Sequence, residues 1–246
     1  LKPLGHLSES LSSIILPCRV LFVKINLSNF LVPAAAQPKQ QAHQQRPRPG
    51  VPAERQISGA CQQERAAEAA QRAKEAVNGA FCGLCNPDAV KEADLCIIAV
   101  PSAGHRATVA SLREELQGKA VLDITVPMAF GPLRYAPPAE GSNALEAVSI
   151  LGPDARFVAG AHTISATLLQ DISKPLDVDA LLVGTDADLK AELQKLFAEI
   201  GIRAFDAGSL VFSPTVESLT PMLIGMNKRY GSKHIGFHLV GFPGED

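Results

Sequence analysis

The chain has 246 residues, 46% of them hydrophobic, and a formal net charge of −2 at pH 7. This length and composition fit a globular protein of one large domain, or of one domain with a smaller partner, and provide enough apolar residues for a buried core. The near-neutral charge argues against a nucleic acid partner, and no apolar run reaches the roughly 18 to 20 residues of a membrane span.

Five cysteines, an odd number at uneven spacing, indicate a reduced, cytoplasmic protein rather than a disulfide-stabilised one. Cys82 and Cys85 form a single CxxC pair. This pair is either a metal or redox site, or two small apolar residues that enter a short strand. Residues 12–36 are apolar like a signal peptide, but Arg19 and Lys24 interrupt them, so we expect no such signal.

The first 62 residues differ in composition from the rest of the chain. Residues 14–25 are suited to a single strand, whereas residues 37–62 are rich in glutamine and proline, which prevents a continuous helix. Such a composition buries too little apolar surface to offset the entropy that ordering costs. We therefore expect residues 1–62 to be irregular or disordered.

A mixed pattern of helices and strands begins at residue 63. Residues 64–77 are rich in alanine, with small residues on one face, which predicts a helix packed closely on a sheet. Continuous apolar runs at 95–100 and 120–124 are typical of parallel strands covered on both faces. The other predicted elements are helices at 86–92, 107–116, 187–200 and 214–230, and strands at 156–159, 180–184, 202–205 and 235–240. This alternation predicts an α/β fold with a mostly parallel sheet.

Distinctive residues follow three of the predicted strands. Val100-Pro101-Ser102 ends one strand, Thr125-Val126-Pro127 ends another, and His162-Thr163-Ile164 follows a third. A proline at a strand exit stops the hydrogen-bond ladder, and ligands of such sheets bind outside the carboxyl ends of the strands. Each motif alone also fits an ordinary turn, but the three together predict a binding site at this edge.

The order of these motifs resembles the NADPH-dependent coenzyme F420 reductase family, also called F420-dependent NADP oxidoreductase. The most specific matches are His-Thr-Ile-Ser-Ala at 162–166 and Glu-Ser-Leu-Thr-Pro at 217–221. Further matches lie at 86–90, 100–105, 125–127, 141–144 and 206–208. The resemblance spans about residues 63–243. It implies a Rossmann-like fold, with an incomplete NADP-binding domain at 63–160 and a smaller C-terminal α/β domain at 161–246 that binds the deazaflavin.

The resemblance implies hydride transfer between NADP(H) and C5 of the deazaflavin coenzyme F420, by a homodimer. Such a reaction needs no catalytic nucleophile and no metal, because positioning supplies most of the barrier reduction. The implied dinucleotide-binding residues are Val100, Pro101, Val126, Met128 and Ala166. The implied deazaflavin-binding residues are His162, Ile164, Ser218, Thr220 and Ile235.

Several histidines and hydroxyl residues also have purely structural interpretations. His162 also fits a core histidine bonded to the backbone, and Ser218 and Thr220 also fit helix N-terminal caps. We expect His105 to pack or cap near its loop, without a catalytic role. His234 and His238 would suit a metal ion only on a helix, whereas residues 235–240 alternate like a strand, so we predict no metal site.

The glycine-rich turn with which the family begins is absent. In the family this turn brings pyrophosphate to a helix N-terminus, and a later strand ends in a Ser-Arg pair. No two glycines in this chain are two residues apart. We interpret residues 1–62 as the product of a reading-frame change or a wrong start. The alternative is a genuine extension in which residues 14–25 replace the first strand, and without the glycines we expect weaker phosphate binding.

Two further functions stay open at this point. The chain also fits a related NADPH-dependent reductase whose acceptor is a flavin, ferric iron or an imine. It also fits a catalytically silent remnant of the fold that binds partner proteins through an exposed surface.

Overall fold

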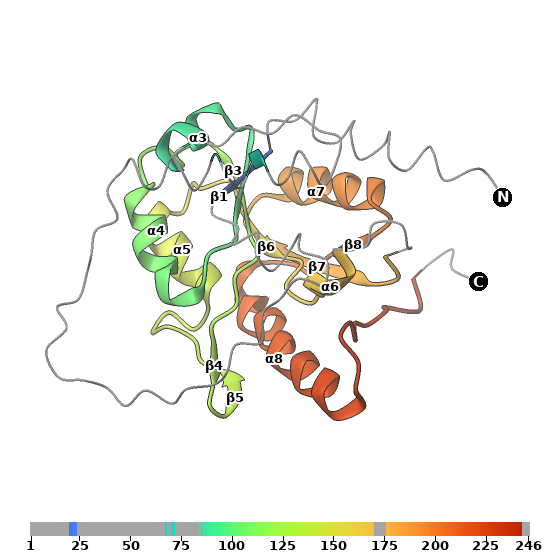
Figure 1. The fold of residues 1–246 in the computed structure, drawn as a ribbon. Helices are drawn as coiled ribbons and strands as arrows, with labels where there is room; N and C mark the ends of the chain where they lie inside the picture. The colour runs from blue at the N-terminus through green and yellow to red at the C-terminus, as the bar shows by residue number, and fades with distance from the viewer. Residues whose placement is uncertain are drawn as a thin grey trace, which may run out of the picture.

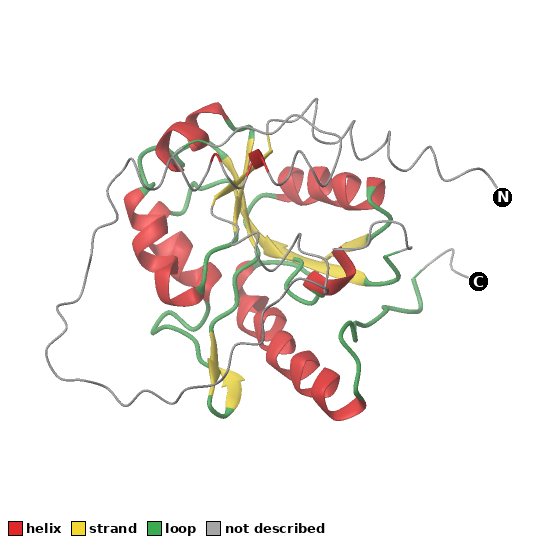
Figure 2. Ribbon diagram, in the orientation of Figure 1, coloured by secondary structure: helices red, strands yellow, loops and turns green. Residues whose placement is uncertain are grey.

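The computed structural model describes residues 20–23, 67, 70, 71, 84, 86–169 and 176–242. Within these residues a central sheet separates two layers of helices (Figure 1). Figure 2 shows the strands gathered between the helices, with a small separate hairpin beside the longest helix. The arrangement confirms the predicted α/β class.

The central sheet has the strand order β1-β2-β3-β6-β7-β8. Its strands are β1 (Val20–Val23), β2 (Leu95–Ile98), β3 (Ala120–Asp123), β6 (Phe157–Gly160), β7 (Asp179–Gly184) and β8 (Arg203–Asp206). All neighbouring strands are parallel except β6 and β7, which are antiparallel. Asp123 pairs with Ile98 on one side and with Ala159 on the other, so β2, β3 and β6 end at the same level. This register brings three loops to one edge of the sheet.

Alternating side chains of the buried strands pack into both helical layers. On one face, Cys96, Ile98 and Phe157 pack against α3 (Asn86–Glu92), α4 (His105–Ser111) and α5 (Asn143–Leu151). On the other face, Leu95, Ile97 and Val158 pack against α7 (Ala187–Glu199). Every residue of β2, β3 and β6 is buried. Their continuous apolar sequences therefore match strands that are covered on both faces.

The remaining elements come after strands β2, β3, β6 and β8 in the chain. They are the 3₁₀ turns η3 (Ser102–Gly104) and η4 (Leu210–Phe212), the short helix α6 (Ala166–Leu169), the long helix α8 (Ser213–Tyr230), and the hairpin of β4 (Met128–Phe130) and β5 (Leu133–Tyr135). In Figure 1, α8 runs beside the hairpin, and the two elements are in contact. They form the lower end of the molecule in that view.

Most of the predicted elements are present, with small shifts of their ends. The helix predicted at 107–116 begins earlier and ends earlier, at His105 and Ser111. The helix at 143–151 and the hairpin at 128–135 were not predicted. The predicted helix at 64–77 lies outside the described residues apart from Ala67, Ala70 and Gln71, which are helical.

The predicted strand at 235–240 is wrong. This segment crosses the start of β7, where the Asp179 N–H donates to the Phe237 carbonyl at 3.2 Å. The Leu239 N–H donates to the Asp179 carboxylate at 2.5 Å, a side-chain acceptor rather than a ladder partner. The β6 ladder reaches only Leu182, Val183 and Gly184 of β7, and the segment makes one backbone hydrogen bond to the start of that strand rather than a ladder.

Two other sequence-based expectations concern residues that lie largely outside the described ones. Strand β1 lies within the run at 14–25, and the rest of residues 1–62 is outside the described residues. Cys82 and Cys85 also lie outside them. None of the described helices combines the length and apolar character that a bilayer crossing demands.

Among the described glycines, Gly160 is the one where an added side chain would make the closest contact. A Cβ atom there would lie 2.5 Å from the Leu181 carbonyl oxygen and 2.6 Å from Leu182 Cδ2. We predict that Gly160→Ala lowers the free energy of unfolding by about 1–3 kcal/mol, measured by urea denaturation, because the β6–β7 pair must separate. As a matched control, Gly225→Ala in α8 meets no atom within 4 Å. It should raise stability by about 0.5–1 kcal/mol. Equal effects at the two positions would contradict this account.

Candidate functional site

Three loops that carry the sequence motifs meet at the carboxyl edge of the sheet. Val100 and Pro101 follow β2, Thr125 and Val126 follow β3, and His162 follows β6. The parallel register of these strands places their ends at one level. The edge is therefore lined by residues that lie far apart in the sequence.

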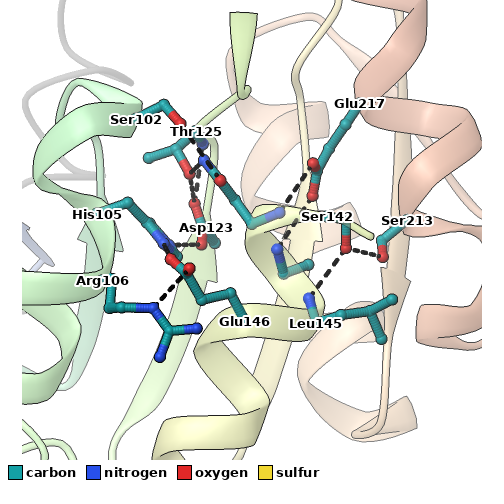
Figure 3. A network of polar contacts seen from close by, with 12 residues as sticks. Ser102, His105, Arg106, Asp123, Thr125, Ser142, Leu145, Glu146, Ser213 and Glu217 are labelled. Carbon is teal, nitrogen blue, oxygen red and sulfur yellow. Dashed lines mark hydrogen bonds and ion pairs between the residues drawn. The ribbon is translucent and has the colours of Figure 1, made fainter. Parts of the chain in front are cut away.

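His105 joins two of the layers through a buried bridge (Figure 3). Its Nε2 lies 2.8 Å from Asp123 Oδ2, and its Nδ1 lies 2.8 Å from Glu146 Oε1. Arg106 extends the bridge, because its Nε donates to Glu146 Oε2 at 3.0 Å and it also pairs with Glu140. The imidazole thus ties the end of β3 to the side of α5. The expectation that His105 packs near its loop is correct, but its bonds reach much further than a cap.

The charge state of His105 follows from its two carboxylate partners. Burial of the ring lowers its pKa, but the hydrogen bonds and charges of Asp123 and Glu146 outweigh that effect and raise the pKa to about 9. The ring is therefore an imidazolium at neutral pH, and both of its N–H groups donate. Charge-assisted bonds of this kind are the stronger ones in proteins.

The second oxygen of Asp123 organises the loop after β3. Asp123 Oδ1 accepts from the Thr125 N–H at 2.8 Å and from the Thr125 hydroxyl at 2.7 Å. The same hydroxyl oxygen accepts from Asn143 Nδ2 at 2.8 Å, and Ser102 Oγ donates to Asn143 Oδ1 at 3.4 Å. The loops after β2 and β3 are therefore both attached to the first residue of α5.

Glu217 attaches α8 to the same end of α5. Its Oε1 accepts from the Ala144 N–H at 3.1 Å, and its Oε2 accepts from the Asn143 N–H at 3.1 Å. The Tyr135 hydroxyl lies 3.0 Å from Oε2. Burial raises the pKa of Glu217 to about 7, although these donors act to lower it. A carboxylate from one helix thus satisfies free N–H groups at the start of another.

A pair of serines supports this junction between α5 and α8. Ser142 is the N-cap of α5, where its Oγ accepts from the Leu145 N–H at 3.0 Å. The same Oγ lies 2.7 Å from Ser213 Oγ, at the start of α8. Figure 3 shows this pair beside Glu217, on the side of α5 away from His105.

His162 is the exception in this otherwise satisfied region. The residue is buried, and neither ring nitrogen has a hydrogen-bond partner among the described residues. Burial lowers its pKa to about 4, against the opposing effect of Asp123, so the ring is neutral. The ring makes no hydrogen bond of normal geometry to the described residues, although the adjacent Asp123 backbone acts to raise its pKa, as expected for a ring that lies close to a backbone acceptor. The carbonyl of His162 accepts from Thr220 Oγ1 at 2.9 Å.

The backbone before His162 is strained. Ala161 has a φ of 59°, in the left-handed region that residues with a Cβ atom seldom adopt. Such conformations cost on the order of 1–3 kcal/mol and concentrate at functional sites. An unpartnered buried ring and a strained backbone at adjacent residues together indicate a ligand site.

The predicted dinucleotide-binding residues lie along the same edge. Val100 is buried and Pro101 is exposed, directly before η3. Val126 and Met128 are half-buried on the chain that leads into the hairpin, and Ala166 is half-buried at the start of α6. No contact between described residues joins all five, so the structure places them around the edge rather than in one cluster.

The predicted deazaflavin-binding residues come from three segments. His162 and Thr220 are joined by a hydrogen bond, and Ile164 packs on a small apolar cluster nearby. Ile235 follows α8, and its N–H donates to Asn227 Oδ1 at 2.9 Å. Ser218 and Thr220 both lie inside α8, which begins at Ser213, so their interpretation as N-terminal caps is wrong.

Sequence reasoning assigned no role to the acidic and amide residues of this network, which are Asp123, Asn143, Glu146 and Glu217. Two signals were available. Asp123 ends an otherwise apolar strand, and Glu217 directly precedes Ser218 in the most specific motif. Their partners could not be read from the sequence, because they lie up to 82 residues away.

The bridge at His105 makes stability depend on pH. Its folded-state pKa is raised, so its contribution is fully present below about pH 6.5 and is lost as the pH rises through about 9. We predict that the free energy of unfolding of the wild type, relative to His105→Gln, falls by on the order of 2–3 kcal/mol across this window. The control is His234→Gln, at an exposed position, which should change stability by less than about 0.5 kcal/mol. A difference that stays flat with pH would contradict the bridge.

Comparison with known proteins supports the resemblance seen in the motifs. The sequence profile of the family described as "NADP oxidoreductase coenzyme F420-dependent" matches residues 50–127, and so begins before residue 63. The F420-dependent NADP reductase of Methanocaldococcus jannaschii is 36% identical over 194 residues, which cover 75% of this chain and 86% of that protein. The F420-dependent NADP reductase of Methanothermobacter thermautotrophicus is 31% identical over 205 residues, which cover 80% of this chain and 88% of that protein.

A solved structure agrees with this relationship at the level of the fold. It is that of a protein from Arthrobacter sp. FB24 proposed to be an F420-dependent NADP reductase. It superposes with a TM-score of 0.63 at 23% identity, and covers 73% of this chain and 86% of that chain. On the sequence matches, the chain belongs to the F420-dependent NADP reductase family.

Proposed function

We propose that this chain is an oxidoreductase that transfers a hydride between NADP(H) and the deazaflavin coenzyme F420. The relatives it matches carry that activity in their names. The observation that carries the proposal is His162, a buried ring without a hydrogen-bond partner among the described residues, at the carboxyl edge of the sheet. A ligand that bonds to this ring would remove the cost of leaving it unpaired.

The carboxyl edge of the sheet suits a nicotinamide ring and a deazaflavin ring that stack face to face. Bound NADPH supplies the hydride, so the protein needs to orient and to exclude water rather than to attack. We assign Val100, Pro101, Val126, Met128 and Ala166 to the dinucleotide, because the resemblance implies them and their segments follow the ends of β2, β3 and β6. The bonds of Thr125 to Asp123 and Asn143 hold the loop that carries Val126.

The other side of the edge offers polar groups to the deazaflavin. A neutral His162 has one N–H donor and one acceptor nitrogen, which suits a ring edge with both donors and acceptors. Ser218 and Thr220 add hydroxyl groups, and Ile235 adds apolar cover. Ile164 carries a stiff β-branched side chain, and we assign it the role of a spacer that sets the stacking distance between the rings.

The absence of the glycine-rich turn affects the binding of NADP rather than the binding of the deazaflavin. We propose that this loss weakens binding of the diphosphate, because backbone N–H groups at a glycine turn are its usual partners. We keep the division into residues 1–62, an incomplete NADP-binding domain at 63–160 and a deazaflavin-binding domain at 161–246 as part of the proposal.

We also propose that the protein is a cytoplasmic homodimer. Large apolar side chains are exposed on α8 and on the neighbouring hairpin, with Met222 52% exposed and Phe130 77% exposed. An apolar surface of this kind is typical of a protein interface. The free, buried Cys96 is consistent with a reducing compartment.

The choice of acceptor tests the proposed function. We predict that the full chain oxidises NADPH when the deazaflavin is the acceptor, and not when the acceptor is FMN, ferric iron or a cyclic imine. The reaction is measured as the loss of deazaflavin absorbance. Oxidation with one of the other acceptors alone would favour a related reductase. No oxidation, together with no change in melting temperature on adding NADPH, would favour a silent remnant of the fold.

Replacement of His162 should separate stability from function. We predict that His162→Leu raises the free energy of unfolding by about 1 kcal/mol, because it removes a buried polar ring that lacks partners. The KM for the deazaflavin should rise by about tenfold or more, the loss of one hydrogen bond worth about 1.4 kcal/mol. The KM for NADPH, measured in the same assay, is the internal control and should change by less than about twofold. A variant that loses stability and keeps its KM for the deazaflavin would overturn the role of His162.

A further inference from the structure

We propose that Glu217 is a positioning residue whose carboxylate holds the deazaflavin side of the site at a fixed distance from the nicotinamide side. This inference rests on the proposed function, since it concerns the same two ligands. Glu217 is fully buried and lies on α8, directly before Ser218 and three residues before Thr220. A shift of α8 relative to α5, which the bonds of this carboxylate resist, would move both of these hydroxyl residues.

The carboxylate is bonded to two other elements at once. It accepts from the N–H groups of Asn143 and Ala144, which open α5. The Tyr135 hydroxyl of β5 lies 3.0 Å from Glu217 Oε2 and 3.0 Å from the Gly141 carbonyl, and its single hydrogen serves these two acceptors. These N–H groups have no acceptor inside α5, because they belong to its first turn. The carboxylate thus closes a joint between α8, α5 and the hairpin.

The joint continues without a break to the nicotinamide side. The Asn143 side chain donates to Thr125 Oγ1 at 2.8 Å, and that hydroxyl donates to Asp123 Oδ1 at 2.7 Å. On the deazaflavin side, Thr220 of the same helix donates to the His162 carbonyl at 2.9 Å. Glu217 therefore lies between the two sets of residues that would hold the two rings.

The joint requires an ionised carboxylate. The two N–H groups of α5 point at its two oxygens, one at each, and protonation would turn one oxygen into a donor that faces another donor. The other titratable groups near it are Tyr135 of β5 and Asp123 of β3, while Glu146 on α5 is engaged with His105. Its pKa, raised to about 7 by burial, means that the joint loosens as the pH falls through neutrality.

Hydride transfer is sensitive to such loosening. A misplacement of about 1 Å between reacting groups costs about 10²-fold in rate. An effect on orientation appears in kcat, whereas an effect on the affinity for NADPH would appear in its KM. This division separates a positioning role from a direct contact with the dinucleotide.

The test compares the full wild-type chain with Glu217→Gln, Tyr135→Phe and Ser213→Ala over pH 6 to 9. Glu217→Gln keeps the shape of the side chain but places an amide NH₂ against the N–H donors of α5. We expect its kcat at pH 8 to fall by about 10- to 100-fold, with a KM for NADPH within about twofold of the wild type. The decline in kcat of the wild type below about pH 7 should be absent in this variant.

The other two variants make the interpretation specific. Tyr135→Phe removes a donor that favours the ionised carboxylate, so the decline in kcat should move to higher pH. Ser213→Ala is the matched control, because it breaks the other bond between α8 and α5, to Ser142. It should lower the melting temperature and leave the pH at which kcat declines unchanged. The same loss of kcat in Ser213→Ala as in Glu217→Gln would overturn the proposal, as would a pH profile that Glu217→Gln does not alter.

Hydrogen exchange keeps the two proposals distinguishable. The amide protection factors of Asn143 and Ala144 should fall below about pH 7 in the wild type and be low at every pH in Glu217→Gln. A wild type that does not reduce the deazaflavin would refute the proposed function alone, and these protection factors would still test the joint. Protection that does not depend on pH or on Glu217 would refute the joint.

Discussion

Every buried carboxylate at the carboxyl edge of the sheet must be matched by donors, and this constraint fixes the loops of the site. Asp123 and Glu217 are 1% and 0% exposed, and each is surrounded by donors from other elements. A buried charge that loses its partners costs several kcal/mol, so these loops cannot move independently. His105 and Asn143 provide the cross-links, from α4 and α5. The edge is therefore rigid before any ligand binds, which is the condition for catalysis by positioning.

His162 stands apart from this satisfied network. Its ring is buried near Asp123 and yet unpaired within the described residues, and it follows the strained Ala161. Both features cost free energy that the surrounding fold has to offset. Rigid carboxylate cross-links on one side and an unpaired ring on the other divide the edge into a scaffold and a place for a ligand. The family to which the chain belongs is named for a reaction between two ring systems, which fits such a division.

Local sequence patterns predicted the strands and helices of the core but not the bonds that join them. The apolar runs that become β2 and β3 were sufficient, because strands covered on both faces need no alternation. Residues 235–240 alternate like a strand, yet they make only a single backbone hydrogen bond to β7, at Asp179. The antiparallel β6–β7 pair, the hairpin at 128–135 and the bonds of Glu217 depend on contacts between distant residues, for which a single sequence carries no local signal. The sequence motifs predicted a site at the carboxyl edge of the sheet, whereas the hydrogen bonds of Asp123, Asn143 and Glu217 are visible only in the structure.

The most direct test of this account follows the hydride itself. NADPH carrying deuterium at the transferred C4 position would be mixed with the deazaflavin and the full chain in ordinary water, and the reduced deazaflavin examined by mass spectrometry and NMR. Direct transfer between rings held face to face predicts that the deuterium is found at C5 of the deazaflavin. Deuterium found in the solvent, with an unlabelled C5, would contradict an edge that works by positioning two rings and excluding water.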